Sequence, residues 1–279
     1  MYKKAAIVIP LDGSQTATAA LGAAQAVTTI MGAVLHIVHV AEARLSEDQL
    51  LDKLKAGPLQ IKTCLLDQVT GDPANAILDY AESINAKMIV MSSHGWTYNR
   101  EYLVGSTAMD IIQGASMPIL VIRPGMINLP NSSWKPIKML CPLNGSPMAA
   151  AQMQLIFEFA KLFDADVDVL NVAFHGKKRP TEAGTITVSK FQDYPHYDMP
   201  AWADEFIRRF CVCQLPGVKV RMFQLAGDPS EVIIRFASEN KDDLIVLSWR
   251  GRLETERAQT IKGLLRKTEM PVLLLKPKT

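Results

Sequence analysis

Two glycines and two hydroxyl residues form a pattern in this sequence that suits the binding of a phosphate group. Gly95 is followed by nine residues, Trp96 to Val104, and then by Gly105-Ser106-Thr107. Glycine lets backbone N–H groups approach a ligand without a Cβ in the way. A helix that begins at Ser106 would add unpaired N–H donors and the positive end of its dipole. The Ser106 and Thr107 hydroxyls can donate to phosphate oxygens as well.

A carboxylate is expected close to this loop. Asp12, in the segment Pro10-Leu11-Asp12-Gly13-Ser14, stands where a first strand ends and a first helix begins, and Gly95 follows the fourth strand. Doubly wound sheets bind ligands beyond the carboxyl ends of their strands, at the point where the strand order reverses. Both segments therefore reach one crevice, where Asp12 could hold a ribose hydroxyl or a metal ion.

The elements that must position these residues occur twice along the chain. Residues 10–14 return as 142–146, with Asn144 in place of Asp12, and Gly71-Asp72-Pro73 returns as Gly227-Asp228-Pro229. Residues 86–95 and 117–124 return as 242–251 and 270–277. Such self-similarity is the signature of a duplicated structural unit. Asp72 and Asp228 each precede a proline, which predicts a helix N-cap in both repeats.

Each repeat alternates short apolar runs with helical periods. In the first repeat the predicted strands are Ala5–Ile9, Val34–Val40, Ile61–Leu66, Met88–Met91 and Ile119–Ile122. Runs that are apolar on both faces favour strands that lie between two layers of helices in a parallel sheet. We therefore predict an α/β fold of two doubly wound, five-stranded parallel-sheet domains. The domains are expected at 1–124 and 136–279, with a turn-rich linker at 125–135 and an inserted surface loop at 175–200.

These residues resemble the universal stress protein family. The family is marked by Gly, two residues, Gly, nine residues and Gly-Ser or Gly-Thr, with an Asp at the end of strand one. The resemblance covers nearly the whole chain, which therefore resembles a tandem universal stress protein. It implies a flavodoxin-like, adenine-nucleotide-hydrolase-like sheet with strand order 3-2-1-4-5. It also implies pairing between last strands, either of the two repeats or of two chains in a homodimer.

The resemblance implies ATP as the ligand of the first repeat and leaves open whether Mg²⁺ or Mn²⁺ accompanies it. Carried over position by position, the residues bordering the adenosine are Pro10, Leu11, Asp12 and Val40, and those around the phosphates are Ser92, Gly95, Gly105, Ser106 and Thr107. Ser92 departs from the family, which has glycine there. If that position needs a positive φ, serine costs about 1–2 kcal/mol and weakens binding roughly tenfold.

The second repeat has lost most of this pattern. Asn144 lacks the charge of Asp12, the loop after Gly251 is three residues shorter, and Gly105-Ser106-Thr107 aligns with Ala258-Gln259-Thr260. Arginines and glutamates alternate nearby, which indicates a mixed-charge face rather than an anion pocket. We expect at most one nucleotide per chain.

The leading hypothesis is a stress-response sensor or regulator that binds ATP. A nucleotide-free scaffold is one alternative, which Ser92 keeps open. A slow ATPase is the other, although the sequence has no Gly-x4-Gly-Lys-Ser/Thr loop and no evident general base. His94 is expected to make a structural hydrogen bond, and Arg100 to be a solvated surface charge.

Composition limits the other classes of function. Hydrophobic residues make up 48% and charged residues 21%, and 30 basic against 28 acidic residues leave a net charge of +2. This charge gives no electrostatic footprint for nucleic acid or anionic membranes. The start of the chain shows neither a signal-peptide core nor a membrane span, so we expect a cytoplasmic protein. Cys64, Cys141, Cys211 and Cys213 lack metal-site spacing and are expected to be core thiols.

Overall fold

A computed structural model describes residues 4–54, 64–95, 104–126, 129–143, 147–173, 217–249 and 256–276. Several sequence-based expectations fall outside these residues. They concern the 175–200 insertion and the single residues Arg100, Asn144, Gly251, Cys211 and Cys213.

The chain divides into two compact units. Unit 1 contains residues 1–135 together with 249–276, and unit 2 contains residues 136–248 with the last three residues. The final helix and strand of the second repeat are therefore counted with unit 1, which differs from a division at the predicted linker. Each unit is described below by itself.

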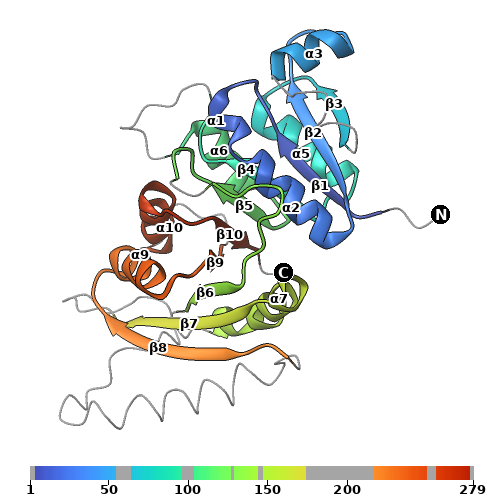
Figure 1. Cartoon of the computed structure of the whole chain (residues 1–279). Helices are drawn as coiled ribbons and strands as arrows, with labels where there is room; N and C mark the ends of the chain where they lie inside the picture. The colour runs from blue at the N-terminus through green and yellow to red at the C-terminus, as the bar shows by residue number, and fades with distance from the viewer. Residues whose placement is uncertain are drawn as a thin grey trace, which may run out of the picture. The chain divides into compact units, whose positions relative to one another are not determined.

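Unit 1 has the predicted parallel sheet of the first repeat. Its strands lie in the order β3 (Cys64–Val69), β2 (Val34–Val40), β1 (Ala6–Pro10), β4 (Met88–Ser92) and β5 (Ile119–Ile122) (Figure 1). All four neighbouring pairs are parallel. This confirms the order 3-2-1-4-5, although β3 runs further along the chain than the predicted Ile61–Leu66.

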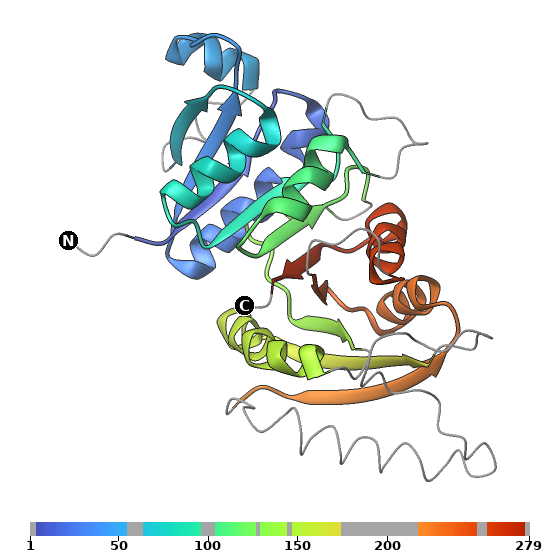
Figure 2. The same cartoon turned by 180° about the vertical axis from the view of Figure 1, so that it is seen from behind.

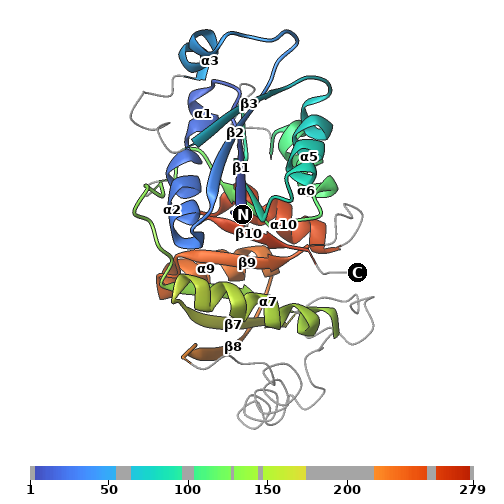
Figure 3. The same cartoon turned by 90° about the vertical axis from the view of Figure 1, so that its right-hand side faces the viewer.

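Helices cover both faces of this sheet. The helices described in the first repeat are α1 (Gln15–Thr18), α2 (Leu21–Met31), α3 (Glu47–Leu54), α5 (Pro73–Ser83) and α6 (Ser106–Gly114). In Figure 3, α1 and α2 lie on one face and α5 and α6 on the other. The residues of β4 and β5 are all buried, as strands between two helix layers require.

Unit 1 differs from a five-stranded parallel sheet by a sixth strand. β10 (Val272–Leu275) pairs antiparallel with β5, with Val272 opposite Val121 and Leu274 opposite Ile119. It follows α10 (Glu256–Lys267). Without β10, β5 would be an open edge strand made only of apolar residues, and such edges favour aggregation. The antiparallel sixth strand covers that edge.

Unit 2 contains four parallel strands in the order β8 (Val220–Ala226), β7 (Asp166–Ala173), β6 (Lys138–Pro142) and β9 (Leu244–Ser248). Figure 2 shows β7 and β8 running side by side. Within the described residues of this unit, the helices are α7 (Pro147–Phe163) and α9 (Pro229–Asn240). The α/β class predicted for both repeats is therefore confirmed.

Both predicted aspartate caps are present. Asp72 Oδ1 accepts a hydrogen bond from the backbone N–H of Asn75, and Asp228 Oδ1 accepts one from that of Glu231, each over 3.1 Å. Pro73 and Pro229 occupy the first helical position, where no N–H is needed. These local signals explain why α5 and α9 begin where they do.

In the part of the chain that the structure describes, no helix is both long enough and apolar enough to cross a bilayer.

Candidate functional site

A cavity of about 320 Å³ opens in unit 1 at the carboxyl ends of β1, β2 and β4. All nine residues that the sequence selected line this cavity: Pro10, Leu11, Asp12, Val40, Ser92, Gly95, Gly105, Ser106 and Thr107. They come from three strand ends and the start of α6. The fold thus brings together four segments that are far apart in the sequence.

The Asp12 carboxylate is held in place by the turn that follows it. Its Oδ1 accepts hydrogen bonds from the backbone N–H of Ser14 over 2.8 Å and from the Ser14 hydroxyl over 2.6 Å. Gly13 between them has φ +86°, in the left-handed region that favours glycine. This turn explains why Asp, Gly and Ser stand in this order after β1.

Two neighbouring hydroxyls lie between this turn and the loop after β4. The Ser14 hydroxyl lies 3.0 Å from the Thr16 hydroxyl, and Thr16 Oγ1 donates to the carbonyl oxygen of Gly95 over 2.7 Å. Ser14 also caps α1 by accepting from the N–H of Ala17. Sequence analysis missed the role of Thr16, because nothing in the local pattern shows that its partner lies 79 residues away.

Each repeat holds the carbonyl after its first strand with a buried donor on its second strand. His39 Nδ1 lies 2.7 Å from the Leu11 carbonyl oxygen, and Asn171 Nδ2 donates to the Leu143 carbonyl over 3.0 Å. A carbonyl oxygen only accepts, so His39 carries its proton on Nδ1. The donor fixes the backbone from which Asp12 projects.

The two glycines of the phosphate pattern lack a side chain for different reasons. A Cβ on Gly95 would lie 2.4 Å from Asp12 Oδ2, so a side chain there would have to displace the carboxylate. Gly105 has φ −59°, which any residue adopts, and a Cβ there would come no closer than 3.6 Å to its nearest neighbour, the Ser93 carbonyl oxygen. Neither strain nor crowding among the described residues demands glycine at position 105. Its smallness keeps the cavity open.

The donors at this end of the cavity differ from those expected. The N–H of Gly105 donates to the carbonyl oxygen of Ser93 over 2.9 Å and is therefore not available to a ligand. The first-turn N–H groups of α6 have no partner within the helix, and no side chain of the described residues caps it. The hydroxyls of Ser106 and Thr107 stand beside these amides at the cavity wall.

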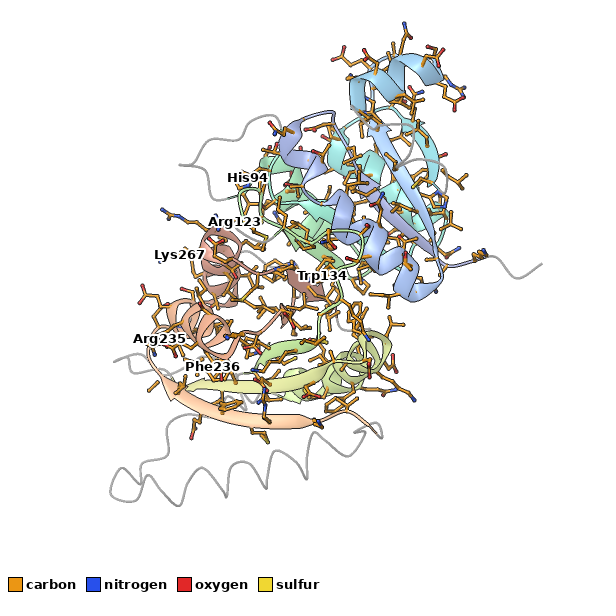
Figure 4. The ribbon with its side chains drawn as sticks, viewed as in Figure 1. His94, Arg123, Trp134, Arg235, Phe236 and Lys267 are labelled. Atoms are coloured by element: carbon orange, nitrogen blue, oxygen red, sulfur yellow. The ribbon has the colours of Figure 1, made fainter. Side chains whose placement is uncertain are left out.

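Ser92 does not carry the strain that a positive φ would impose. It is the last residue of β4, opposite Ile122, and it is absent from the positive-φ residues of the described chain. Its hydroxyl accepts a hydrogen bond from the N–H of His94 over 3.3 Å. His94, labelled in Figure 4, has its Nδ1 2.9 Å from the Ser93 hydroxyl, which confirms the expected structural hydrogen bond.

Part of the cavity lining is apolar. Residues that sequence analysis did not select belong to it: Ala17, Val38, Pro73, Ile77, Met91, Ala108 and Ile111. The sequence did contain a signal for Val38. It is two residues from Val40 on β2, and residues two apart on a strand point to the same face. Among the described lining residues there is no lysine or arginine. An anionic group in this cavity would thus depend on amides, hydroxyls and an accompanying cation.

The chain matches the model of the universal stress protein family twice, over residues 1–123 and 137–276. The chain belongs to the universal stress protein family. It is 30% identical over 146 residues to a universal stress protein of Methanocaldococcus jannaschii, which covers 44% of this chain and 83% of that protein. A second universal stress protein of that organism is 29% identical over 157 residues, covering 44% and 96%.

Solved structures resemble both repeats together. A universal stress protein from Archaeoglobus fulgidus has a TM-score of 0.64 at 15% identity and covers 98% of this chain and 96% of its own. A putative universal stress protein from Pseudomonas aeruginosa has a TM-score of 0.68 at 15% identity, with 98% and 94% covered. At such identities the likeness shows the fold alone. Two family matches in one chain show a tandem universal stress protein.

The second repeat of this universal stress protein places its counterpart of Gly105 differently. Ala258 lies inside α10, which begins at Glu256, and it is fully buried. Gly105, by contrast, is the residue before α6 begins. The helix of the second repeat therefore starts earlier relative to the motif. No glycine precedes its first turn at the position that corresponds to Gly105.

Metal-ligating side chains do not cluster in the described stretches. No group of three or more His, Cys, Asp or Glu residues suited to a metal ion occurs among them. Cys141 is buried as expected of a core thiol, whereas Cys64 on β3 is half-buried. Among the described residues that line the cavity, Asp12 is the one carboxylate.

Proposed function

We propose that this universal stress protein binds ATP in the cavity of unit 1 and acts as a nucleotide-dependent regulator in the stress response. Family membership supports the stress-response role. The observation that carries the proposal of ATP is the convergence of all nine motif residues on one cavity that is lined by both apolar and polar groups.

The apolar and polar parts of the cavity lining suit the two ends of a nucleotide. Val40, Pro73 and Ile77 offer an apolar surface to a planar base, as ligand pockets commonly do. The polar part offers the first-turn amides of α6 and the hydroxyls of Ser106 and Thr107, which suit phosphate oxygens. The absence of a side chain at Gly105, which neither φ nor crowding requires, leaves room for them.

Asp12 supplies the charge that a nucleotide complex needs. Its carboxylate can accept a hydrogen bond from a ribose hydroxyl. It can instead bind Mg²⁺ or Mn²⁺, for which ATP phosphates and water would provide the remaining oxygen ligands. A cation would compensate for the lack of lysine and arginine among the described lining residues.

We propose that the protein binds ATP without hydrolysing it. His94 is held by Ser93, and the described cavity lining presents no second carboxylate that could act as a general base beside Asp12. A regulator needs only that the occupied and empty forms differ in shape or in partners.

One experiment separates the three functional hypotheses. Freshly purified protein is denatured, released nucleotide is identified by chromatography, and apo protein is then titrated with MgATP and MnATP by calorimetry and incubated with ATP. ATP bound with a stoichiometry near one per chain and recovered unchanged supports the proposal. Steady formation of ADP would support the ATPase, and no binding at millimolar ATP would leave the nucleotide-free scaffold. A stoichiometry near two would refute the assignment to unit 1 alone.

A further inference from the structure

A cluster of charges with two buried carboxylates lies in unit 2, outside the candidate nucleotide site. Lys138 begins β6, Asp168 lies on β7, Arg221 on β8, and Asp242 stands two residues before β9. Asp168 is 0% exposed and Asp242 is 4% exposed. Two buried carboxylates in one place are costly unless cations and hydrogen bonds compensate them.

Asp168 is well compensated. Arg221 Nε donates to its Oδ1 over 2.7 Å, and Arg221 Nη2 donates to its Oδ2 over 2.9 Å. Lys138 Nζ lies 3.5 Å from the same Oδ2. A two-pronged guanidinium contact with a second cation beside it compensates the buried charge of Asp168.

Asp242 is poorly compensated. Its nearest cation is Lys138 Nζ, 4.0 Å from Oδ1, and that ammonium group also donates to the Asn240 carbonyl. Neither carboxylate oxygen of Asp242 has a hydrogen-bond partner among the described residues. An ionised Asp242 is therefore a buried anion with one distant counter-ion and with Asp168 as a negative neighbour.

The surroundings raise the pKa of Asp242 towards neutral pH. Burial raises the pKa of Asp242 to about 7, with a further increase from Asp168 and Asp243 and a partial decrease from Lys138 and Arg221. The nearby Cys141 thiol does not titrate in this range, because burial and the two carboxylates raise its pKa far above the usual value. Asp242 is thus the group of this cluster that changes charge near neutral pH.

The fold itself does not require an acid at this position. The matching residue of the first repeat is Ala86, which is buried in the same place before β4. Asp243, the next residue, carries the structural role instead. Its carboxylate accepts hydrogen bonds from the N–H groups of Ile137 and Lys138, and its own N–H donates to the Lys138 carbonyl, which ties the start of β9 to β6.

We propose that Asp242 is a proton-sensing residue of unit 2. It holds a proton at and below neutral pH and releases it to solvent above, where the buried anion that remains weakens the junction of β6 and β9. The sign follows from linkage. The folded chain keeps this proton at pH values where an unfolded aspartate, with a pKa near 3.8, has lost it. The free energy of unfolding therefore falls as pH rises from about 4 to about 7 and levels off above.

Direct titration of the intact protein tests the assignment without any substitution. In the full chain labelled with ¹³C at aspartate carboxyl carbons, one aspartate resonance should titrate with a midpoint near pH 7, and it should be missing from Asp242→Asn. If no aspartate resonance titrates above pH 6, or if the one that does persists in Asp242→Asn, the proposal is overturned.

Thermal unfolding tests the consequence. At pH 8, Asp242→Asn should melt about 4 °C or more above the wild-type chain, and at pH 4, where the unfolded chain also keeps much of this proton, the two should nearly agree. Glu239→Gln, an exposed neutralisation on α9, is the matched control and should follow the wild type at both pH values. If Asp242→Asn fails to fold, the same measurement is made on Asp242→Ala, because alanine is the matching residue of the first repeat. A melting difference that is the same at both pH values would contradict the proposal.

Discussion

The Thr16 hydroxyl donates a hydrogen bond to the Gly95 carbonyl oxygen over 2.7 Å, and this contact joins the loop after β1 to the loop after β4. The Ser14 hydroxyl, which lies 3.0 Å from the Thr16 hydroxyl, donates to the Asp12 carboxylate. The proposed contact for ribose or cation and the proposed phosphate loop are therefore mechanically linked. A substitution at Thr16 can therefore affect both segments, although Thr16 is not itself one of the proposed nucleotide contacts.

Removing the Thr16 hydroxyl should weaken ATP binding. Thr16→Val keeps the shape of the side chain but leaves the Gly95 carbonyl without this donor. We expect an affinity for ATP that is about 5- to 10-fold lower, the equivalent of one hydrogen bond of about 1 kcal/mol. Calorimetric titration with MgATP measures it. Thr18→Val on the same helix is the control, because its hydroxyl only bonds the nearby Gln15 carbonyl. Equal losses in both variants would show that the link to Gly95 has no special role.

Substitution of Gly105 should separate binding from stability. An aspartate is a favoured N-cap residue and its charge suits a helix start, so Gly105→Asp should leave the stability of the fold unchanged or raise it by up to about 1 kcal/mol. The same carboxylate would face the phosphates of ATP, and we expect affinity to fall by at least roughly 100-fold. Urea unfolding and calorimetry measure the two effects.

The matched control for this experiment is Gly251→Asp in the second repeat. Because only the first repeat has kept the motif, this substitution should leave ATP affinity and stoichiometry unchanged. Loss of binding in Gly251→Asp, or normal binding in Gly105→Asp, would remove the division of roles between the two repeats.

Much of the fold and the site could be predicted because their signals are local. The apolar runs of β4 and β5, the caps at Asp72 and Asp228, and the glycine spacing of the motif each lie within a short stretch of sequence. Parallel-sheet topology then brings strand ends together, so the nine motif residues reach one cavity.

The rest depends on partners that are distant in sequence. The sequence does not reveal that the Gly105 N–H donates to the Ser93 carbonyl or that the Thr16 hydroxyl reaches the Gly95 carbonyl. Periodicity records which face of an element is buried and not which donor meets which acceptor. The Asp242 cluster is hidden for the same reason, since its four charges come from four strands or strand starts and meet only in the folded unit.

Restoring the family glycine at position 92 should bring little gain. Ser92 lies in β4 without a positive φ, so the strain that would have weakened binding is absent. We expect Ser92→Gly to change ATP affinity by less than about 3-fold and to cost about 0.5–1 kcal/mol of stability, because a glycine in a strand has more conformational freedom to lose. Parallel calorimetry and urea unfolding of the variant and the wild type decide this. A tenfold gain in affinity would mean that the bound state needs a backbone conformation that serine resists.

The end of α6 should depend on two donors from the last part of the chain. Trp249 Nε1 donates to the Ile112 carbonyl and Lys276 Nζ to the Gln113 carbonyl, each over 2.8 Å, and both carbonyls belong to the final turn of the helix, where no intrahelical partner exists. Trp249→Phe keeps an aromatic ring but leaves the buried Ile112 carbonyl unpaired, so we expect a loss of about 1–2 kcal/mol in the free energy of unfolding. Urea unfolding followed by circular dichroism measures it, since tryptophan fluorescence would itself change.

Trp134→Phe, in the half-exposed connector, is the matched control and should cost less than about 0.5 kcal/mol. If the two variants lose the same stability, the indole N–H of Trp249 is not what secures the end of α6.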